Sequence, residues 1–458
     1  PGVDPARLAI TGESGGATQT MMLAAIDDRL AAVFPCVMVS TAMQGGCTCE
    51  NANYLRINQG NIDIAAAFAP KPMGLTAAND WTKELATKGF PDLKEVWSKL
   101  GKPDNLLATF NVHWAHNYNH VSRTTMYGFM NKHFKLGFSE PVLEREFVVP
   151  STADMSVWTA AHPKPTGDKV GGPHEKALLK HWSDDSDRLI AGRDEIVGRA
   201  WEIMIGRTLP AEGEVRAERG ARSQRGNIAV TTGTVHHTKH NEAVPFALAR
   251  PADDKWNGTL ALWLTSGGPE SLRGEGDNFI PAVQKLLDAG IAVASLTPYL
   301  AGATEQPLNP PKVQDPKRND WRWTPSYTYG YNPTLVAHRV RDVMTAVAAV
   351  KTGDAQTRDA KIILIGSDGA GVVAAAADAL LKDLLAGADI DTEGFRFASL
   401  DDPWHPQFVP GAVKYGDVPA LLRLSQSLKP TVLGEGGAKG GADAVAAAVL
   451  KVAERIAR

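Results

Sequence analysis

The feature that most constrains the fold of this chain is a glycine-rich turn close to its first residue. Residues 7–11, RLAIT, form a short apolar run that is typical of a buried strand. The turn GESGG follows, with Ser14 at its apex, and a helical stretch begins near Gly15. Gly12 and Gly16 stand two residues to either side of Ser14, where side chains would collide with the neighbouring strand and helix. This G-x-S-x-G pattern predicts a strained strand-to-helix turn that exposes a serine nucleophile, and an ordinary glycine-rich turn such as a phosphate loop is the alternative.

An acidic residue and a histidine follow Ser14, each near the end of a predicted strand. The apolar run within residues 71–80, KPMGLTAAND, ends just before Asp80, and the run that opens residues 106–119, LLATFNVHWAHNYN, leads to His116. In doubly wound sheets, chemistry collects at the carboxyl ends of the strands. The order Ser14, Asp80, His116 is that of an α/β-hydrolase, and it differs from the order in other serine hydrolase folds.

Each of these residues has a predicted role, because a serine hydroxyl is a weak nucleophile until a neutral imidazole accepts its proton. His116 is the general base and later the acid for the leaving group, while Asp80 holds its tautomer and offsets the imidazolium charge. The backbone N–H of Gly15, at the start of the following helix, faces the developing oxyanion. The alternatives are a solvated loop carboxylate at position 80 and a different base. Two neighbouring histidines compete for that role: His113 and His120.

Three separated blocks of sequence resemble the α/β-hydrolase esterases of the acetyl xylan esterase and dienelactone hydrolase-like group. The blocks are GESGG, then GCTCENANYLR with NIDIAAAFAPKPMGLTAANDWT, then HNYNHVSRTTMYGFMNKH, and the resemblance covers residues 1 to about 140. It implies Ser14 as nucleophile, Asp80 as acid, His116 as base and the N–H of Gly15 as one oxyanion donor. It also implies hydrolysis of carboxylic esters, often acetyl or related groups on plant polysaccharides, and it favours an exported protein, either secreted or periplasmic.

The block CENANYLR contributes further candidate site residues. Glu50 and Arg56 carry charges within this stretch, and together with Asn51 they are predicted to line the substrate pocket. The alternative is a structural loop that its own polar contacts hold together.

Residues 227–458 contain a second series of predicted strands and helices around a sharp glycine-rich turn, like the series around Ser14. Strands, helices and a sharp turn follow one another in the blocks GTLALWLTSGG, IAVASLTPYL, NPTLVAHRVRDVMTAVAAVKT and KIILIGSDGAGVVAAAADALL. The turn carries Asp368 where the nucleophilic serine should stand, and Ser367 lies one residue out of register. His405 is the last histidine of the chain, and Glu435, at the acid position, would have no partner. We therefore predict an inactive hydrolase copy, and the alternative is an Asp368 nucleophile with His405 as its base.

The two copies together predict an α/β fold of tandem α/β-hydrolase modules, each a doubly wound, mostly parallel sheet flanked by helices. Residues 1–150 are expected to form the catalytic module, residues 151–226 a linker with one or two helices, and residues 227–458 the second module. Only 13 residues precede Ser14, whereas the second copy places several strands ahead of Asp368. The first module is therefore expected to lack its N-terminal strands, which would expose a sheet edge and favour association.

Two stretches have an unusual composition. Residues 212–227, EGEVRAERGARSQRGN, are rich in arginine and glutamate and are predicted to be an exposed connector. Residues 319–333, NDWRWTPSYTYGYNP, contain tryptophan and tyrosine side chains that can stack on sugar rings, with core or loop packing as the alternative.

Composition excludes several classes of function. The chain has 458 residues, with 48 Lys and Arg against 51 Asp and Glu, and it carries no long basic run, which argues against nucleic acid as a partner. No apolar stretch reaches the ~20 residues that a membrane helix needs, so a membrane is not expected as a partner either.

Three cysteines are too few for a disulfide scaffold and are predicted as free thiols, with one disulfide as the alternative. They fall within one short stretch: Cys36, Cys47 and Cys49.

These observations predict a serine carboxylic ester hydrolase that forms an acyl-enzyme on Ser14 and needs no metal or organic cofactor. Its substrate is expected to be a small-molecule or polysaccharide ester. A serine peptidase of the same fold is one alternative, because the chemistry of the turn is shared. A non-catalytic binding or scaffold protein is the other, because one copy has lost its serine.

Overall fold

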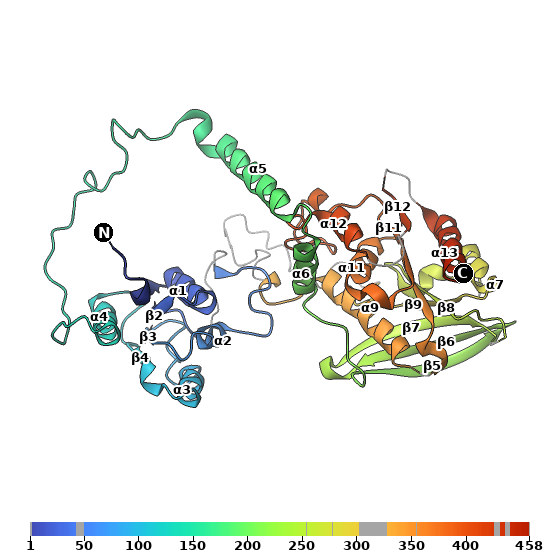
Figure 1. The fold of residues 1–458 in the computed structure, drawn as a ribbon, viewed down its shortest axis with the longest axis horizontal. Helices are drawn as coiled ribbons and strands as arrows, with labels where there is room; N and C mark the ends of the chain where they lie inside the picture. Colours follow the sequence, from blue (N-terminus) through green and yellow to red (C-terminus); the bar gives the residue numbers. More distant parts are fainter. Residues whose placement is uncertain are drawn as a thin grey trace. The chain divides into compact units, whose positions relative to one another are not determined.

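The computed structural model of the chain describes residues 2–42, 50–252, 254–276, 278–301, 328–353, 355–425, 431–435 and 440–457. Its contacts divide the chain into two compact units, residues 1–165 with 315–332 and residues 166–314 with 333–458, and each is described by itself (Figure 1). Of the helices in the described ranges, none combines the length and the hydropathy that a membrane crossing requires.

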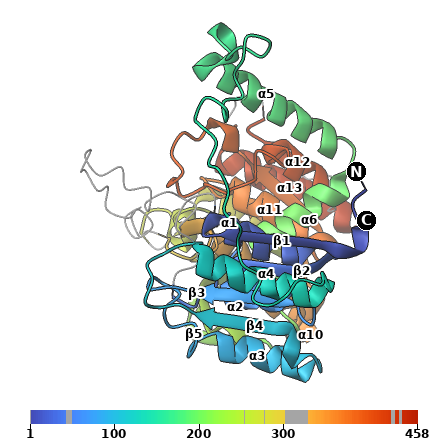
Figure 2. The same ribbon diagram turned by 90° about the vertical axis from the view of Figure 1, so that its left-hand side faces the viewer.

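The first unit is built on a sheet of four parallel strands that lie in chain order. The strands are β1 (Leu8–Glu13), β2 (Leu30–Cys36), β3 (Met73–Ala77) and β4 (Leu106–Phe110). Figure 2 shows them side by side, and β1, β3 and β4 coincide with the predicted apolar runs. Because the strands are parallel, their carboxyl ends share one edge of the sheet. The segments that follow β1, β3 and β4 therefore all leave the sheet at that edge.

Helices cover both faces of this sheet. They are α1 (Gly15–Ile26), α2 (Asn61–Ala66), α3 (Phe90–Lys99) and α4 (His120–Phe134). The first three share an apolar core with one face, in which Met21, Leu75 and Trp97 are fully buried. On the other face, α4 packs the ring of Phe129 edge-on against Phe34 of β2, with 5.6 Å between the ring centroids. Burial of each such side chain stabilises the fold by about 1.5–3 kcal/mol, so both faces contribute to holding the sheet edge in place.

The second unit contains a mixed sheet of eight strands in the order β12-β11-β10-β8-β9-β7-β6-β5. The strands are β5 (Val215–Arg225), β6 (Ile228–His237), β7 (Glu242–Pro251), β8 (Thr259–Leu264), β9 (Ala292–Leu296), β10 (Lys361–Gly366), β11 (Gly387–Asp391) and β12 (Thr431–Leu433). β8 to β12 pair in parallel, whereas β5, β6 and β7 form antiparallel pairs and β7 joins β9 antiparallel. The predicted α/β class with mostly parallel, doubly wound sheets is confirmed.

The prediction that residues 212–227 form an exposed connector is wrong. Most of this stretch is β5, which pairs antiparallel with β6 from Val215 to Arg225 at the edge of the sheet. Nearly all of its side chains are exposed, so the strand shows no apolar alternation and is held by its backbone hydrogen bonds. Charged side chains along an edge strand also hinder pairing with a strand of another molecule. This explains why a stretch with so many exposed charges forms a strand here.

Helices flank the second sheet as well. They are α5 (Gly171–Ile190), α6 (Asp194–Ile205), α7 (Pro281–Asp288), α9 (Leu335–Lys351), α10 (Ala355–Arg358), α11 (Gly371–Leu381), α12 (Asp417–Leu424) and α13 (Gly441–Ala457). α7 and α13 pack on one face, while α9 and α11 pack on the other with α6 and α12 beside them (Figure 1). The helices expected between the modules are α5 and α6. Short 3-10 turns complete the described elements: Pro5–Arg7, Pro103–Asn105, Gly167–Lys169, Thr238–His240, Gly268–Leu272, Lys382–Leu384 and Phe397–Ser399.

Cys36 is a buried free thiol at the end of β2. Its Sγ atom lies 2.6 Å from the hydroxyl oxygen of Thr76, and burial raises the pKa of the thiol to about 11. The thiol is therefore neutral at physiological pH and acts as a packing group. Cys47 and Cys49 lie outside the described residues.

A buried carboxyl group in β11 makes the stability of the second unit depend on pH. Asp389 is fully buried, and neither of its oxygens has a hydrogen-bond partner in the part of the chain that the structure describes. Burial, together with the nearby Asp391 charge, raises its pKa to about 8. This pKa is above the value of the same group in the unfolded chain. The contribution of Asp389 to the free energy of unfolding is therefore most favourable below about pH 4 and becomes less favourable as pH rises towards 8.

We expect Asp389→Asn to remove this dependence, because the amide has the same shape and no charge. The variant should unfold at a similar urea concentration to the wild type at pH 4, and it should be more stable by about 5 kcal/mol at pH 8. Urea unfolding at both pH values tests this, with the exposed Asp254 changed to asparagine as the control. Equal stability of Asp389→Asn and wild type at pH 8 would contradict the prediction.

Candidate active site

Ser14 lies between β1 and α1 in a backbone conformation that L-residues rarely adopt, with φ 57° and ψ −120°. Its N–H donates to the carbonyl of Cys36 at 3.1 Å, and its own carbonyl accepts from the N–H groups of Ala17 and Thr18 at 2.9 and 3.0 Å. The residue is therefore fixed on both sides by the end of β2 and the first turn of α1. Strain of this kind persists only where the surroundings determine it, and it commonly marks a functional residue.

The two glycines that flank Ser14 differ in the space around them. A Cβ atom at Gly12 would lie 2.4 Å from the backbone carbonyl of Gly16, because β1 and α1 cross closely there. A Cβ atom at Gly16 would meet no atom within 4 Å. The sequence argument that side chains at both positions collide therefore holds for Gly12 and is wrong for Gly16.

The segments after β3 and β4 bring Asp80 and His116 together. His116 Nδ1 lies 2.7 Å from Asp80 Oδ2, and the other oxygen of Asp80 accepts hydrogen bonds from the backbone N–H and the hydroxyl of Thr82 at 2.7 and 2.5 Å. The Asp80 side chain is only 7% exposed, and the indole ring of Trp81 stacks against the imidazole with 4.6 Å between centroids. The carboxylate is thus fixed in a geometry in which it can orient the imidazole and stabilise its charged form. His113 and His120 contact the ring of Trp114 instead.

A second carboxylate, which the sequence argument did not identify, reaches the same imidazole. Glu13 Oε1 lies 2.8 Å from His116 Nε2, the nitrogen that a triad histidine directs at the serine. No hydrogen bond joins the hydroxyl of Ser14 to His116 within the described residues. Glu13 is the residue directly before Ser14, so its position inside GESGG was visible in the sequence, but the contact depends on where His116 returns to the sheet edge.

Glu50 borders the predicted oxyanion site from the far side of the turn. Its side chain is buried, and a Cβ atom at Gly15 would lie 3.0 Å from Glu50 Oε1. A carboxylate oxygen so close to the backbone of Gly15 lies beside the N-terminus of α1, where a negative charge is favoured. That Glu50 contacts the substrate is a prediction from the sequence that these contacts do not test.

Arg56 is buried in the same loop and makes its described hydrogen bonds to that loop. Its Nη1 donates to the carbonyl of Glu50 at 2.6 Å and its Nε donates to Asn61 Oδ1 at 3.2 Å. Nη2 is buried and has no hydrogen-bond partner among the described residues. Burial lowers the pKa of the guanidinium, and the Glu50 charge opposes that shift. These contacts fit the alternative of a structural loop, and a contact between Arg56 and substrate stays a prediction.

A segment from far along the chain completes this loop. The N–H groups of Tyr54 and Arg56 donate to the carbonyls of Tyr329 and Gly330 at 2.7 and 2.8 Å, and the hydroxyl of Tyr331 donates to Asn51 at 3.3 Å. Tyr329 and Tyr331 belong to the aromatic stretch that was predicted as a sugar-binding or packing element, and their contacts here are those of packing. Residues 319–327 of that stretch lie outside the described residues.

The turn of the second unit also has a positive φ at its apex, and it carries different side chains. Asp368 has φ 49°, and Gly366 approaches the start of α11 as Gly12 approaches α1. The hydroxyl of Ser367 is buried and accepts a hydrogen bond from the indole N–H of Trp263 at 2.9 Å. The N–H of Gly369, which corresponds to that of Gly15, donates to Glu393 Oε1 at 2.7 Å. A carboxylate therefore occupies the position where an oxyanion would bind.

The groups around this second turn have partners of their own. His405 Nδ1 accepts from the backbone N–H of Gln407 at 3.1 Å. Glu435, at the acid position, was expected to lack a histidine partner. Within the described residues it forms an ion pair with Arg396, from the loop after β11, and accepts a hydrogen bond from Thr392 at 2.5 Å.

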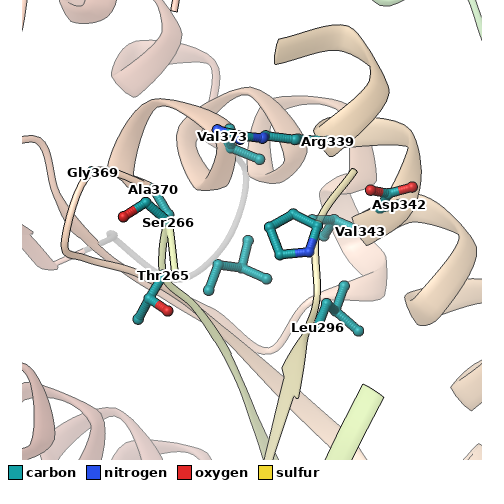
Figure 3. Close-up of a pocket in the computed structure, with 11 residues that line it drawn as sticks. Thr265, Ser266, Leu296, Arg339, Asp342, Val343, Gly369, Ala370 and Val373 are labelled. Atoms are coloured by element: carbon teal, nitrogen blue, oxygen red, sulfur yellow. The ribbon is translucent and has the colours of Figure 1, made fainter. Parts of the chain in front are cut away.

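A small hollow of about 20 Å³ lies beside the second turn. Figure 3 shows Ser266 and Gly369 on one side of it and Asp342 of α9 on the other. Asp342 accepts a hydrogen bond from the N–H of Tyr299 at 2.7 Å, and burial raises its pKa to about 7. The hollow thus contains an acid without a described histidine partner.

The chain is similar to several esterases of known structure. No family model and no curated protein matches it. Methylesterase BT1017 is 30% identical over 29% of this chain, with a TM-score of 0.28, and the chain spans about a third of its length, 31%. A putative acetyl xylan esterase from Bacteroides fragilis is 13% identical, with 60% of this chain and 76% of that chain covered and a TM-score of 0.37. A glucuronoyl esterase from Solibacter usitatus is 14% identical, with 56% and 80% covered and a TM-score of 0.35.

Proposed function

We propose that this chain is a serine carboxylic ester hydrolase whose nucleophile is Ser14. The observation that carries the proposal is the strained serine at the end of β1 in the same unit as a buried Asp80 bonded to His116 at 2.7 Å. Ser14, Asp80 and His116 follow β1, β3 and β4, which are three strands of one parallel sheet, so all three residues lie at the same sheet edge.

The proposed reaction has two steps. His116 Nε2 takes the proton of Ser14 as Oγ attacks the ester carbonyl, and Asp80 stabilises the imidazolium that forms. The N–H of Gly15 donates to the oxyanion, His116 returns the proton to the leaving alcohol, and an acyl group remains on Ser14. Water then attacks the acyl-enzyme with His116 again as base, which releases the acid and restores the serine.

Carbohydrate esters are the substrate class that we favour. The motif resemblance is to acetyl xylan esterases, and the names of the similar structures include acetyl xylan esterase, glucuronoyl esterase and methylesterase.

The second turn is proposed to be inactive, because its apex residue is Asp368 and because Glu393 accepts the hydrogen bond from the N–H of Gly369. A peptidase is the alternative within the same chemistry, and release of nitrophenol from nitrophenyl acetate without cleavage of a peptide anilide separates the two.

Covalent labelling by a fluorophosphonate tests the proposal, because only an activated serine is phosphonylated. We expect the wild type and Asp368→Ala to be labelled, Ser14→Ala not to be labelled, and peptide mass spectrometry to locate the adduct on Ser14. Heat-denatured wild type is the control for non-specific reaction. A folded wild-type chain that takes no label would overturn the proposal in favour of a binding or scaffold protein.

A further inference from the structure

We infer that Glu13 holds His116 as an imidazolium in the resting site, so that one proton must leave before His116 can act as the base. The kinetic part of this inference rests on the proposed function, whereas the protonation state does not. Glu13 is a positioning residue in this scheme, because it acts on the reaction through His116.

The proton count of the imidazole leads to this conclusion. A neutral imidazole has one N–H, and in a triad it points from Nδ1 to the acid. His116 Nδ1 lies 2.7 Å from Asp80 Oδ2, and His116 Nε2 lies 2.8 Å from Glu13 Oε1. If the ring were neutral, the lone pair of Nε2 would face a carboxylate oxygen at hydrogen-bond distance, and the two would repel. Both contacts are favourable when both ring nitrogens carry protons, which is the imidazolium form.

The surrounding charges favour the same form. Asp80 approaches the ring from the segment after β3 and Glu13 approaches it from the end of β1. The uncharged ring of Trp81 stacks on the imidazole, and the Glu50 carboxylate lies on the far side of the turn beside Gly15. The charged groups that these elements direct at the site are thus carboxylates.

The contact must open for catalysis. His116 Nε2 cannot accept the proton of Ser14 while it donates to Glu13. The Glu13 side chain is 28% exposed and the His116 side chain 30%, so both can reach solvent when the contact breaks. Loss of the proton to solvent leaves Nε2 free to accept from Ser14, and Glu13 then has no donor to keep it against the ring. Activity should therefore rise with pH as this proton leaves.

Replacement of Glu13 by glutamine tests the kinetic consequence. A glutamine amide can donate an N–H to a neutral Nε2, so the extra proton is no longer needed. We expect the acid limb of the kcat/KM profile for nitrophenyl acetate to move to lower pH by about one unit in Glu13→Gln. Glu84→Gln, which loses the same charge at a surface pair with Lys88, should keep the wild-type profile. Equal profiles for wild type and Glu13→Gln, or an equal shift in Glu84→Gln, would overturn the inference.

Nitrogen NMR of the imidazole tests the protonation state without any activity. The His116 signals are assigned by their loss in His116→Gln. At pH 7 we expect both ring nitrogens of His116 to be protonated in the wild type and one of them to be unprotonated in Glu13→Gln. A neutral His116 in wild type at pH 7 would overturn the inference even if Ser14 takes the fluorophosphonate. Conversely, an imidazolium in a chain that takes no label would refute the proposed function alone.

Discussion

Exchange of Asp80 for asparagine is expected to lower kcat/KM for a short-chain aryl ester by about 10⁴-fold while the chain stays folded. The carbonyl oxygen of the new amide can still accept the two hydrogen bonds that Thr82 gives to Asp80 Oδ1. The amide nitrogen then faces His116 Nδ1 and donates to it, which forces the ring proton onto Nε2. In that tautomer the imidazole cannot accept the proton of Ser14. Initial rates measured on wild type and Asp80→Asn test this.

The comparison with Ser14→Ala shows whether these residues act as one unit. Ser14→Ala should lose about 10⁴-fold to 10⁶-fold in rate, and the double variant with Asp80→Asn should lose little more than Ser14→Ala does. Asp28→Asn, an exposed acid of the same unit, should keep the wild-type rate. A loss of less than tenfold in Asp80→Asn would count against the triad. Additive losses in the double variant would show that the residues act independently.

A methyl group at Gly12 is expected to disrupt the turn that holds Ser14. Its Cβ atom would lie 2.4 Å from the carbonyl carbon and oxygen of Gly16, and neither backbone segment can yield without moving β1 or α1. We expect Gly12→Ala to destabilise the first unit by about 3 kcal/mol and to abolish labelling of Ser14 by the fluorophosphonate. Urea unfolding and labelling measure the two effects.

Gly16→Ala provides the matched control at the other end of the motif. Its Cβ atom would meet nothing within 4 Å, and alanine favours a helix over glycine by up to about 1 kcal/mol. Stability and labelling should therefore be preserved or slightly improved. The second turn already carries Ala370 at the corresponding place. Tolerance of alanine at Gly12, or equal damage at both positions, would show that close approach of the strand and helix is not the reason for the glycine.

Local patterns in the sequence were sufficient to predict the elements that position the site. β1, β3 and β4 are short apolar runs, and each ends a few residues before Ser14, Asp80 or His116. Parallel pairing then brings their ends to one edge, so the contact between Asp80 and His116 follows from strand order. The glycines of GESGG likewise predicted the strained turn at Ser14.

Contacts that depend on distant segments could not be predicted in the same way. The position of the imidazole of His116 beside Glu13 depends on the path of the loop after β4, and the periodicity of the sequence does not predict that path. β5 was missed because an edge strand with both faces in solvent has no alternation of apolar and polar residues. The ion pair of Glu435 with Arg396 joins two loops that are far apart in the sequence.

The hydrogen bonds from Tyr54 and Arg56 to Tyr329 and Gly330 have a consequence for how the chain is made. A ribosome releases the residues of β1 to β4 long before it reaches residue 329. The loop that carries Glu50 therefore cannot form these backbone hydrogen bonds until residues 329 and 330 have been synthesised. Contacts between residues so far apart in the sequence also form slowly. A nascent chain cut after residue 165 would contain every residue of the proposed triad and still lack the segment that seals the loop beside it. Maturation of the first unit thus depends on synthesis of a segment that comes after the residues of β5 to β9, between the two sequence stretches that form the second unit.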